Sequence, residues 1–596
     1  MLRIASKAAA LAAAEGYPAT LRQLLMLALI TLAGACSTND PRRHANFQDG
    51  QDPNCIREYA RLDTEIWTEI NNPATSDDSR QKLLEAQGRE IRREMHDPQY
   101  ANCWNLAYEH HPADPPADSL KQPPHEPFEL FYAEFDDQGM PTDKVAGQLD
   151  FAQSQMYLIQ TRLREILKAE TKAGGGIILV VFTHGWHGNA SADNDYSTEF
   201  KAILQKVAEE EARDTARKQD AGERKTLVRV KERLTIGVEI AWRGDSFEHP
   251  ALPFVPGSKS ALNIWNRKHA AETVAKGSVH ELLAFLSEFY LSNSCNEGPT
   301  TQDALEGGCD RVHMLTLGHS FGALINYGTL ISRIERGLNT GCDARAYAFG
   351  DLTVLLNPAF EGSRYAPVFE SAMHHPDVFG HYPGGSEKDG ACLAVQGGTP
   401  AGNPPAAQTA APGAADDVQL PVLVTLQSSG DTATGTAFPI FKALSVFSNT
   451  NTPFDDEARN EREAAGWVKN FRTHHLALQD APGRWCHKKP TDPPWYCPKN
   501  WSSTSTTLTP ASSDQAKGEV LEWAATNPAR FPDYFPIWSV MVDASIMRNH
   551  DDIWNPRIIG FIVKLFRDVY DQADTIHYDR ARATIAGNGQ QKMPAR

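Results

Sequence analysis

Basic residues are scarce in this sequence, in which 58 lysines and arginines stand against 75 aspartates and glutamates and the formal net charge is −17. A nucleic-acid partner requires a basic surface that displaces counterions, and the chain has no basic stripe. The apolar run Leu24–Ala33 falls short of the ~20 residues that a membrane-spanning helix needs. We therefore expect no nucleic-acid partner, and the hydrophobic content of 41% predicts a globular protein with a large core.

The N-terminal segment has the organisation of an export signal. Basic residues precede the apolar run, which ends in the small residues Leu32-Ala-Gly-Ala-Cys36. This pattern predicts a signal peptide over residues 1–35. The small residues resemble a bacterial lipobox, and that resemblance implies cleavage before Cys36, acylation of Cys36, export to the bacterial cell envelope and a lipid anchor in the outer membrane. The alternative is an ordinary secretory signal with an incidental cysteine.

The nine cysteines are consistent with an exported protein, because a lipidated Cys36 leaves eight that can all pair. Eight cysteines allow many connectivities, and the sequence does not choose among them. Any disulfide implies an oxidising compartment. Pairing of nearest neighbours would join Cys55 with Cys103, Cys295 with Cys309, Cys342 with Cys392, and Cys486 with Cys497.

Composition divides the chain into segments of different character. A polar stretch without periodicity predicts a tether, and apolar helical spacing in Ile56–Asn71 and Asp77–Met95 predicts a helical hairpin before the main domain. Stretches rich in Gly, Ala and Pro, or lacking periodicity, predict insertions in that domain. The predicted segments are a tether at 36–51, the hairpin segment at 52–126, the main domain at 127–575 with insertions at 384–418 and 456–525, and a tail at 576–596.

The main domain alternates apolar, β-branched runs with amphipathic runs. Such alternation predicts an α/β fold with a mostly parallel sheet and helices on both faces. The expected strands are Phe128–Phe135, Gly176–Thr183, Leu234–Trp242, Val312–Leu317, Ala346–Leu356, Pro421–Leu426 and Pro536–Ile546. The expected helices are Asp150–Lys172, Ser197–Arg213, His269–Tyr290, Ser320–Arg336 and Pro556–Tyr570.

The pentapeptide Gly318-His-Ser-Phe-Gly322 matches the G-x-S-x-G pattern of a nucleophilic serine. So short a motif also occurs by chance, so its context decides its meaning. An apolar strand precedes Ser320 and an amphipathic helix follows it, which is the strand–turn–helix setting that the motif requires. The glycines let neighbouring backbone approach a strained turn. We therefore take Ser320 as a candidate nucleophile, with His319 adjacent to the site.

A second motif, Val181-Phe-Thr-His-Gly-Trp-His-Gly-Asn189, follows another apolar strand. It resembles the His-Gly loop of lipases and esterases of the α/β-hydrolase superfamily. The resemblance implies an oxyanion hole formed by the backbone amides of Phe321 and of Trp186 or Gly185. The competing interpretation takes His184 and His187 as metal ligands, but no convincing further ligand motif accompanies them.

The superfamily order of serine, acid and histidine implies the remaining members of a triad. Asp431 follows the strand-like run Pro421–Leu426, and Asp351 is the rival acid. His550 lies between the last expected strand and the last expected helix, where the superfamily places its catalytic histidine. The other histidines after Asp431 are His474, His475, His487 and His577.

Together these residues predict a lipid-anchored serine hydrolase that cleaves carboxylic esters through an acyl-enzyme and requires no cofactor. The expected partners are a small-molecule or lipid ester and the membrane, which the chain would contact through its anchor. Amide or thioester hydrolysis is possible with the same triad. A non-catalytic surface lipoprotein that uses the fold as a binding scaffold is the alternative from another class. The sequence leaves the oligomeric state open.

Overall fold

The computed structural model describes residues 42–45, 52–70, 75–113, 126–143, 154–220, 231–244, 258–294, 311–338, 348–374, 420–440, 460–479, 518–523 and 535–571. Outside these residues lie the predicted signal peptide, Cys36, the insertion at 384–418, the tail at 576–596, and six of the eight other cysteines. His487 and His577 also lie outside them. Among the described helices, none is long and apolar enough to cross a membrane.

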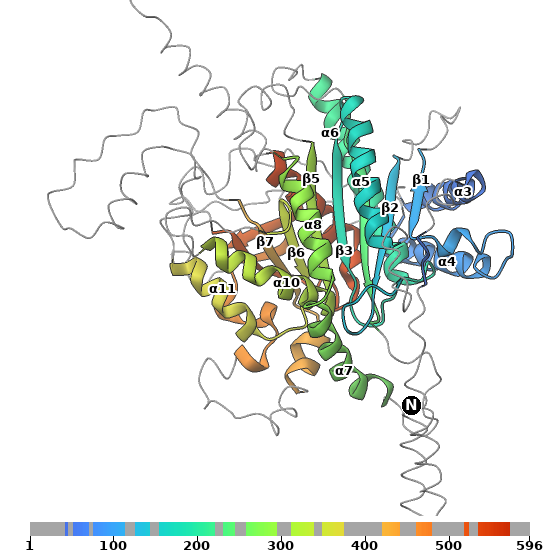
Figure 1. Ribbon diagram of the computed structural model, residues 1–596. Helices are drawn as coiled ribbons and strands as arrows, with labels where there is room; N and C mark the ends of the chain where they lie inside the picture. The colour runs from blue at the N-terminus through green and yellow to red at the C-terminus, as the bar shows by residue number, and fades with distance from the viewer. Residues whose placement is uncertain are drawn as a thin grey trace, which may run out of the picture.

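A ten-stranded sheet forms the centre of the protein, in the order β1-β2-β4-β3-β5-β6-β7-β10-β8-β9 (Figure 1). The strands β1 and β9 at the two edges pair antiparallel with their neighbours, and all other pairs are parallel. The bounds are β1 Tyr108–His111, β2 Phe128–Phe135, β3 Ile177–Thr183, β4 Leu234–Trp242, β5 Val312–His319, β6 Leu352–Leu356, β7 Leu423–Ser428, β8 His474–Gln479, β9 Gly518–Trp523 and β10 Ile537–Val542.

Helices cover both faces of the sheet, because successive side chains of each inner strand point to opposite faces and both sets are apolar. In β3, for example, Leu179 and Val181 join one core and Ile178 and Val180 join the other. The first core includes α5 (Gln155–Lys172), α7 (Ser258–Val274), α8 (Val279–Leu291), α10 (Phe321–Leu338) and α11 (Gly362–His374). The second includes α6 (Asp195–Asp220) and the helix at 556–571. The α/β class and the mostly parallel sheet agree with the sequence.

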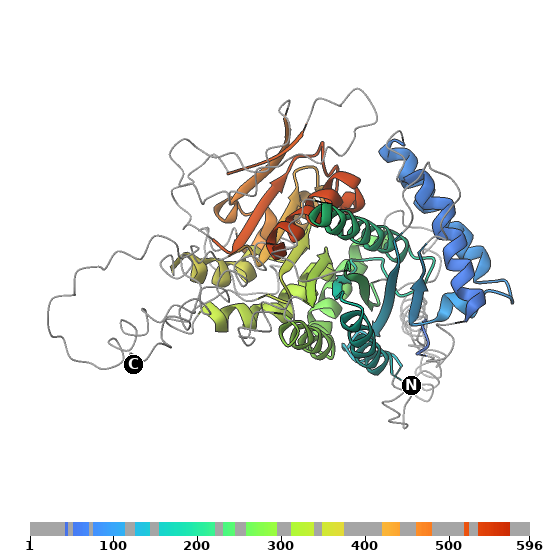
Figure 2. The same cartoon turned by 90° about the horizontal axis from the view of Figure 1, so that it is seen from above.

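The helices α3 (Pro53–Ile70) and α4 (Asp77–Glu94) lie at the β1 end of the sheet (Figure 2). Ser76 caps α4, because its side chain accepts a hydrogen bond from the Ser79 amide. The disulfide Cys55–Cys103 joins α3 to the segment before β1, and it is one of the nearest-neighbour pairings that the sequence allowed without choosing among connectivities. The strand β1 was not expected from the sequence, because it is short and its Glu and His residues lack the apolar character of the inner strands.

Arg43 requires a correction to the predicted tether at 36–51. The Arg43 side chain is fully buried and lies 3.7 Å above the ring of Tyr132. The Arg43 guanidinium donates to the Ala190 carbonyl and to Glu109, and the Arg43 amide donates to Glu134. Residues 42–45 are therefore part of the folded domain, a role that their polar composition conceals.

Several expected boundaries in the main domain also differ from the structure. The segment 456–525 predicts an insertion, yet β8 and β9 lie within it and extend the sheet. The expected helix His269–Tyr290 is interrupted before α8 at Gly277, where a Cβ would lie 2.5 Å from the Gly139 carbonyl oxygen. The expected strand Ala346–Leu356 begins only at Leu352, and α11 was not expected. These differences concern element boundaries and the edge of the sheet, and each expected strand still overlaps an observed strand.

Candidate active site

Ser320 occupies a sharp turn between the last residue of β5 and the first residue of α10. Its backbone φ is +55°, in the left-handed region that side chains other than glycine rarely adopt. The turn is tight against the neighbouring strand end, since a Cβ at Gly322 would lie 2.1 Å from the Thr183 carbonyl oxygen. The Ser320 amide donates to the Leu356 carbonyl at 3.0 Å, which fixes the turn to β6. Ser320 is thus held at the carboxyl ends of the central parallel strands.

The structure brings Ser320, His550 and Asp431 into one hydrogen-bonded chain. The Ser320 hydroxyl lies 2.8 Å from His550 Nε2, and His550 Nδ1 lies 2.9 Å from Asp431 Oδ2. Asp431 follows β7, and His550 lies in the connection between β10 and the helix at 556–571. Each residue therefore comes from the carboxyl end of a different parallel strand, the edge at which open α/β sheets carry their sites.

Asp431 is buried and receives several hydrogen bonds besides that from His550. The amides of Ala433 and Thr434 donate to Oδ1 at 2.9 and 3.0 Å, and Gln427 and the Thr434 hydroxyl donate to Oδ2. Burial opposes ionisation, but the hydrogen bond and charge of His550, together with Thr434, lower the pKa of Asp431 to about 2. The carboxylate is therefore ionised at neutral pH.

His550 is placed to act as a base. Burial alone favours the neutral ring, but the hydrogen bond to Asp431 and the charge of that carboxylate raise the pKa of His550 above its ordinary value. With Nδ1–H donating to Asp431, the neutral ring presents the Nε2 lone pair to the Ser320 hydroxyl. This is the tautomer that can accept a proton from the Ser320 hydroxyl.

The loop after β3 lies directly against the serine. A Cβ at Gly185 would lie 3.0 Å from Ser320 Cβ and 2.9 Å from His319 Nδ1, so only glycine permits this approach. His184 holds the loop in place, since Nε2 accepts from the Trp242 amide at 3.1 Å and Nδ1 donates to the Gly185 carbonyl at 3.0 Å. The structure therefore places Gly185, with its neighbour Trp186, beside Ser320.

The histidines of this loop do not form a metal site in the described part of the chain. Both nitrogens of His184 make hydrogen bonds, and burial lowers the pKa of His184 to about 4. His187 is exposed and stacks on Trp186 with ring centroids 4.0 Å apart. His184 therefore shapes the loop, and the two histidines have different environments rather than a shared ligand position.

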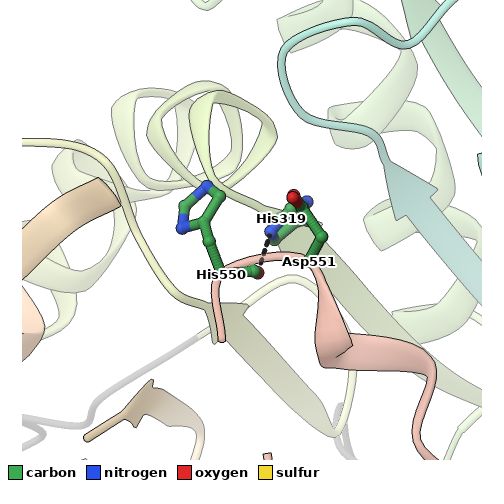
Figure 3. A group of neighbouring side chains, drawn as sticks. All are labelled: His319, His550 and Asp551. Atoms are coloured by element: carbon green, nitrogen blue, oxygen red, sulfur yellow. Dashed lines mark hydrogen bonds between the residues drawn. The ribbon is translucent and has the colours of Figure 1, made fainter. Parts of the chain in front are cut away.

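His319, His550 and Asp551 have ligand atoms within 4.8 Å of one another (Figure 3). A metal ion there would compete with existing hydrogen bonds. His319 Nε2 donates to the His550 carbonyl at 2.9 Å, and both ring nitrogens of His550 serve Ser320 and Asp431. The donor set therefore suits a proton-transfer site better than a cation site.

The rival candidates lie elsewhere. Asp351 accepts from the Met314 amide and the Tyr290 hydroxyl, both at 2.8 Å, near the opposite end of β5 from Ser320. His474 and His475 belong to β8, and burial lowers the pKa of His474 to about 3. None of these side chains hydrogen-bonds to Ser320, His550 or Asp431 among the interactions of the described residues.

Four residues that hydrogen-bond to the site residues were not identified from the sequence. Tyr196 bonds to His319 and Asn357 to the His550 carbonyl, and Gln427 and Thr434 bond to Asp431. Asn357 and Gln427 lie at the carboxyl end of β6 and β7, respectively, so their places at strand ends were a usable signal. Tyr196 and Thr434 carried no comparable signal, because hydroxyl-bearing residues near helix starts are common.

Comparison of the chain with protein-family models, with curated proteins and with solved structures finds no match.

Proposed function

We propose that this protein is a serine hydrolase of the α/β-hydrolase superfamily that cleaves carboxylic esters. The observation that carries the proposal is the hydrogen-bonded chain of Ser320, His550 and Asp431, with the serine in a left-handed turn between strand and helix. The chain order of serine, acid and histidine, and the position of the His-Gly loop after β3, further support membership of this superfamily.

The reaction begins with neutral His550. Its Nε2 takes the Ser320 hydroxyl proton as Oγ attacks the acyl carbonyl, and Asp431 stabilises the resulting imidazolium. The imidazolium then gives its proton to the leaving alcohol, which leaves an acyl group on Ser320. Water activated by the same ring releases the acid and restores the serine.

Charge that develops on the substrate oxygen needs fixed donors. The Phe321 amide opens α10 directly after the nucleophile, at the positive end of the helix dipole. We assign this amide and that of Trp186 or Gly185 to the oxyanion hole, supported by the close approach of Gly185 to Ser320. Loss of one such donor typically costs ~10²–10³-fold in rate.

Labelling with a fluorophosphonate probe tests the proposal. The probe forms a covalent bond only with an activated serine, so we expect labelling of the wild type and none of Ser320→Ala. The matched control is Ser539→Ala, which changes a buried serine of β10 with no bond to the triad among those described. An unlabelled wild type would support the non-catalytic scaffold, whereas equal labelling of Ser320→Ala would show that the reactive serine is another residue and would contradict Ser320 as the nucleophile. Parallel assays of matched ester, amide and thioester substrates then decide the bond cleaved.

We further propose that the protein is exported to the bacterial cell envelope and anchored to the outer membrane by a lipid on Cys36. The sequence Leu32-Ala-Gly-Ala-Cys36 supports acylation, and the disulfide Cys55–Cys103 fits an oxidising compartment. Growth with an alkyne-tagged palmitate should label the wild type and leave Cys36→Ser unlabelled. Labelling that survives in Cys36→Ser would contradict the anchor without affecting the hydrolase proposal.

A further inference from the structure

The carbonyl oxygen of His550 receives two partly buried hydrogen bonds. His319 Nε2 donates to it at 2.9 Å and Asn357 Nδ2 at 2.8 Å. Figure 3 shows the first of these bonds, and the His319 and His550 ring centroids lie 4.8 Å apart. Both donor residues are almost completely buried, and they come from the carboxyl ends of β5 and β6. They attach the histidine loop to the centre of the sheet.

The His319 bond depends on a particular tautomer. The His550 carbonyl can only accept, so the proton of the neutral His319 ring resides on Nε2, and Nδ1 accepts from the Tyr196 hydroxyl at 2.9 Å. Burial and the nearby charge of His550 keep the pKa of His319 well below its ordinary value. The neutral ring therefore donates to the His550 carbonyl and adds no charge beside the base.

Asn357 connects the acid to the base. Its Oδ1 accepts from the Ser428 amide at 2.8 Å and from Gln427 Nε2 at 3.2 Å, while its Nδ2 donates to the His550 carbonyl. Gln427 in turn donates to Asp431 at 3.0 Å. The backbone φ of Asn357 is +43°, a conformation that asparagine tolerates better than most residues.

Local polar contacts shape the loop around His550, since Asn549 Oδ1 accepts from the amides of Asp551 and Asp552 and Arg548 pairs with Asp552. The bonds from His319 and Asn357 are those that tie the His550 carbonyl to the ends of β5 and β6. Arg548, Asn549 and Asp551 beside His550 are exposed, so the loop lacks a packed apolar side chain at this point. A displacement of ~1 Å in a reacting group can cost ~10²-fold in rate.

We propose that His319 and Asn357 act as a carbonyl clamp: two positioning residues that hold the backbone of His550 so that its ring meets Ser320 and Asp431 together. This inference rests on the proposed hydrolase function. It assigns His319 a role in positioning the base, distinct from the chemistry that Ser320 and His550 perform.

The clamp is tested by removing and restoring its donors. His319→Met removes the donor, whereas His319→Gln keeps an N–H near the position of Nε2. Asn357→Asp keeps the shape and the acceptor for Ser428 but places an oxygen against the His550 carbonyl. His313→Gln changes another buried histidine of β5, far from the site, and is the matched control. Each variant is measured for kcat and KM on a soluble ester, with active serines counted by the fluorophosphonate probe.

We expect kcat per active serine to fall ~10–100-fold in His319→Met and Asn357→Asp with KM nearly unchanged, and to recover most of this loss in His319→Gln. His313→Gln should retain its kcat whatever its thermal stability. A wild-type kcat in His319→Met would overturn the clamp. So would an equal loss of kcat in His319→Met, His319→Gln and His313→Gln. A wild type that the probe does not label would instead count against the hydrolase proposal itself.

Discussion

His550 and His111 are both histidines that face an aspartate, yet their second nitrogens meet different groups. His550 has Asp431 at 2.9 Å on Nδ1 and the Ser320 hydroxyl on Nε2. His111 has Asp63 at 2.6 Å on Nδ1 and Glu109 at 3.1 Å on Nε2. A ring between two carboxylates donates from both nitrogens and stays protonated, whereas a ring between a carboxylate and a hydroxyl keeps a lone pair that can accept a proton.

The surroundings of His111 indicate that His111 and Asp63 stabilise the fold. Glu109 also meets Arg43 and Lys201, at 2.9 and 2.8 Å, and all these side chains are buried. Burial opposes protonation, but Asp63 and Glu109 raise the pKa of His111 above its ordinary value. The cluster therefore holds paired charges inside the fold, and the comparison shows that the partner of the second nitrogen decides whether the ring keeps a lone pair.

The largest effect expected from this comparison is that of His550→Ala. Removing the base should lower kcat for a soluble ester by ~10⁶-fold, because the serine loses its proton acceptor, while the thermal midpoint changes little. Steady-state hydrolysis and a melting curve measure the two quantities. A kcat within tenfold of the wild type would exclude His550 as the base.

Asp431→Asn should cost ~10⁴-fold in kcat, because the ring loses the carboxylate that sets its tautomer. The pH profile sharpens the test. Activity requires neutral His550, so the rate rises as pH passes upward through the pKa of His550, which Asp431 raises. In the variant, the acid limb of kcat/KM should move to lower pH. An acid limb at the wild-type position would contradict this assignment.

Much of this site could be predicted from sequence because it depends on local patterns at strand ends. The glycines around Ser320 and in the His184–Gly188 loop lie where two backbone segments approach each other closely, as the short Cβ distances at Gly185 and Gly322 demonstrate. Asp431 and His550 required the superfamily order, since nothing local distinguishes His550 from other polar-loop histidines. Asn357 contacts His550, which lies 193 residues further along the chain, and no local sequence pattern indicates such a contact.

The fold divides in a similar way. The inner strands were predictable because burial on both faces makes them continuous apolar runs, as in β3 and β5. The strands β1, β8 and β9 were missed because each includes polar residues and lies toward an edge of the sheet. Arg43 was misassigned to the tether, because only its tertiary partners make its burial favourable.

The role of His111 is tested by His111→Gln. The substitution removes one charge from a buried cluster, so the free energy of unfolding should fall by ~3–5 kcal/mol. Urea denaturation followed by tryptophan fluorescence measures the loss. The kcat per probe-labelled serine should stay near the wild-type value, in contrast to the catalytic loss in His550→Ala. A comparable catalytic loss in the two variants would break the distinction between the two histidines.

The pH dependence of that loss has a defined sign. Because the folded protein raises the pKa of His111, the stabilisation is fully present below the unfolded pKa of about 6.5 and is lost as pH rises through the folded value. The difference in unfolding free energy between the wild type and His111→Gln should therefore be larger near about pH 6 than near about pH 9. A difference independent of pH would indicate that His111 is not charged in the fold.

Removal of the disulfide Cys55–Cys103 should have the smallest effect of the four changes, after those at His550, Asp431 and His111. Cys55–Cys103 closes a loop with a sequence separation of 48, and Tyr59, which stacks on His111, donates to the Cys103 carbonyl at 2.6 Å. The double variant Cys55→Ser/Cys103→Ser should lose ~2–4 kcal/mol of stability, because the unfolded chain regains the freedom that the bond removes. The double variant is preferable to a reductant, which would act on every cysteine pair. Urea denaturation measures the loss, and kcat per labelled serine should be retained. A lost kcat at full labelling would mean that the His111 region also governs the geometry of the His550 site.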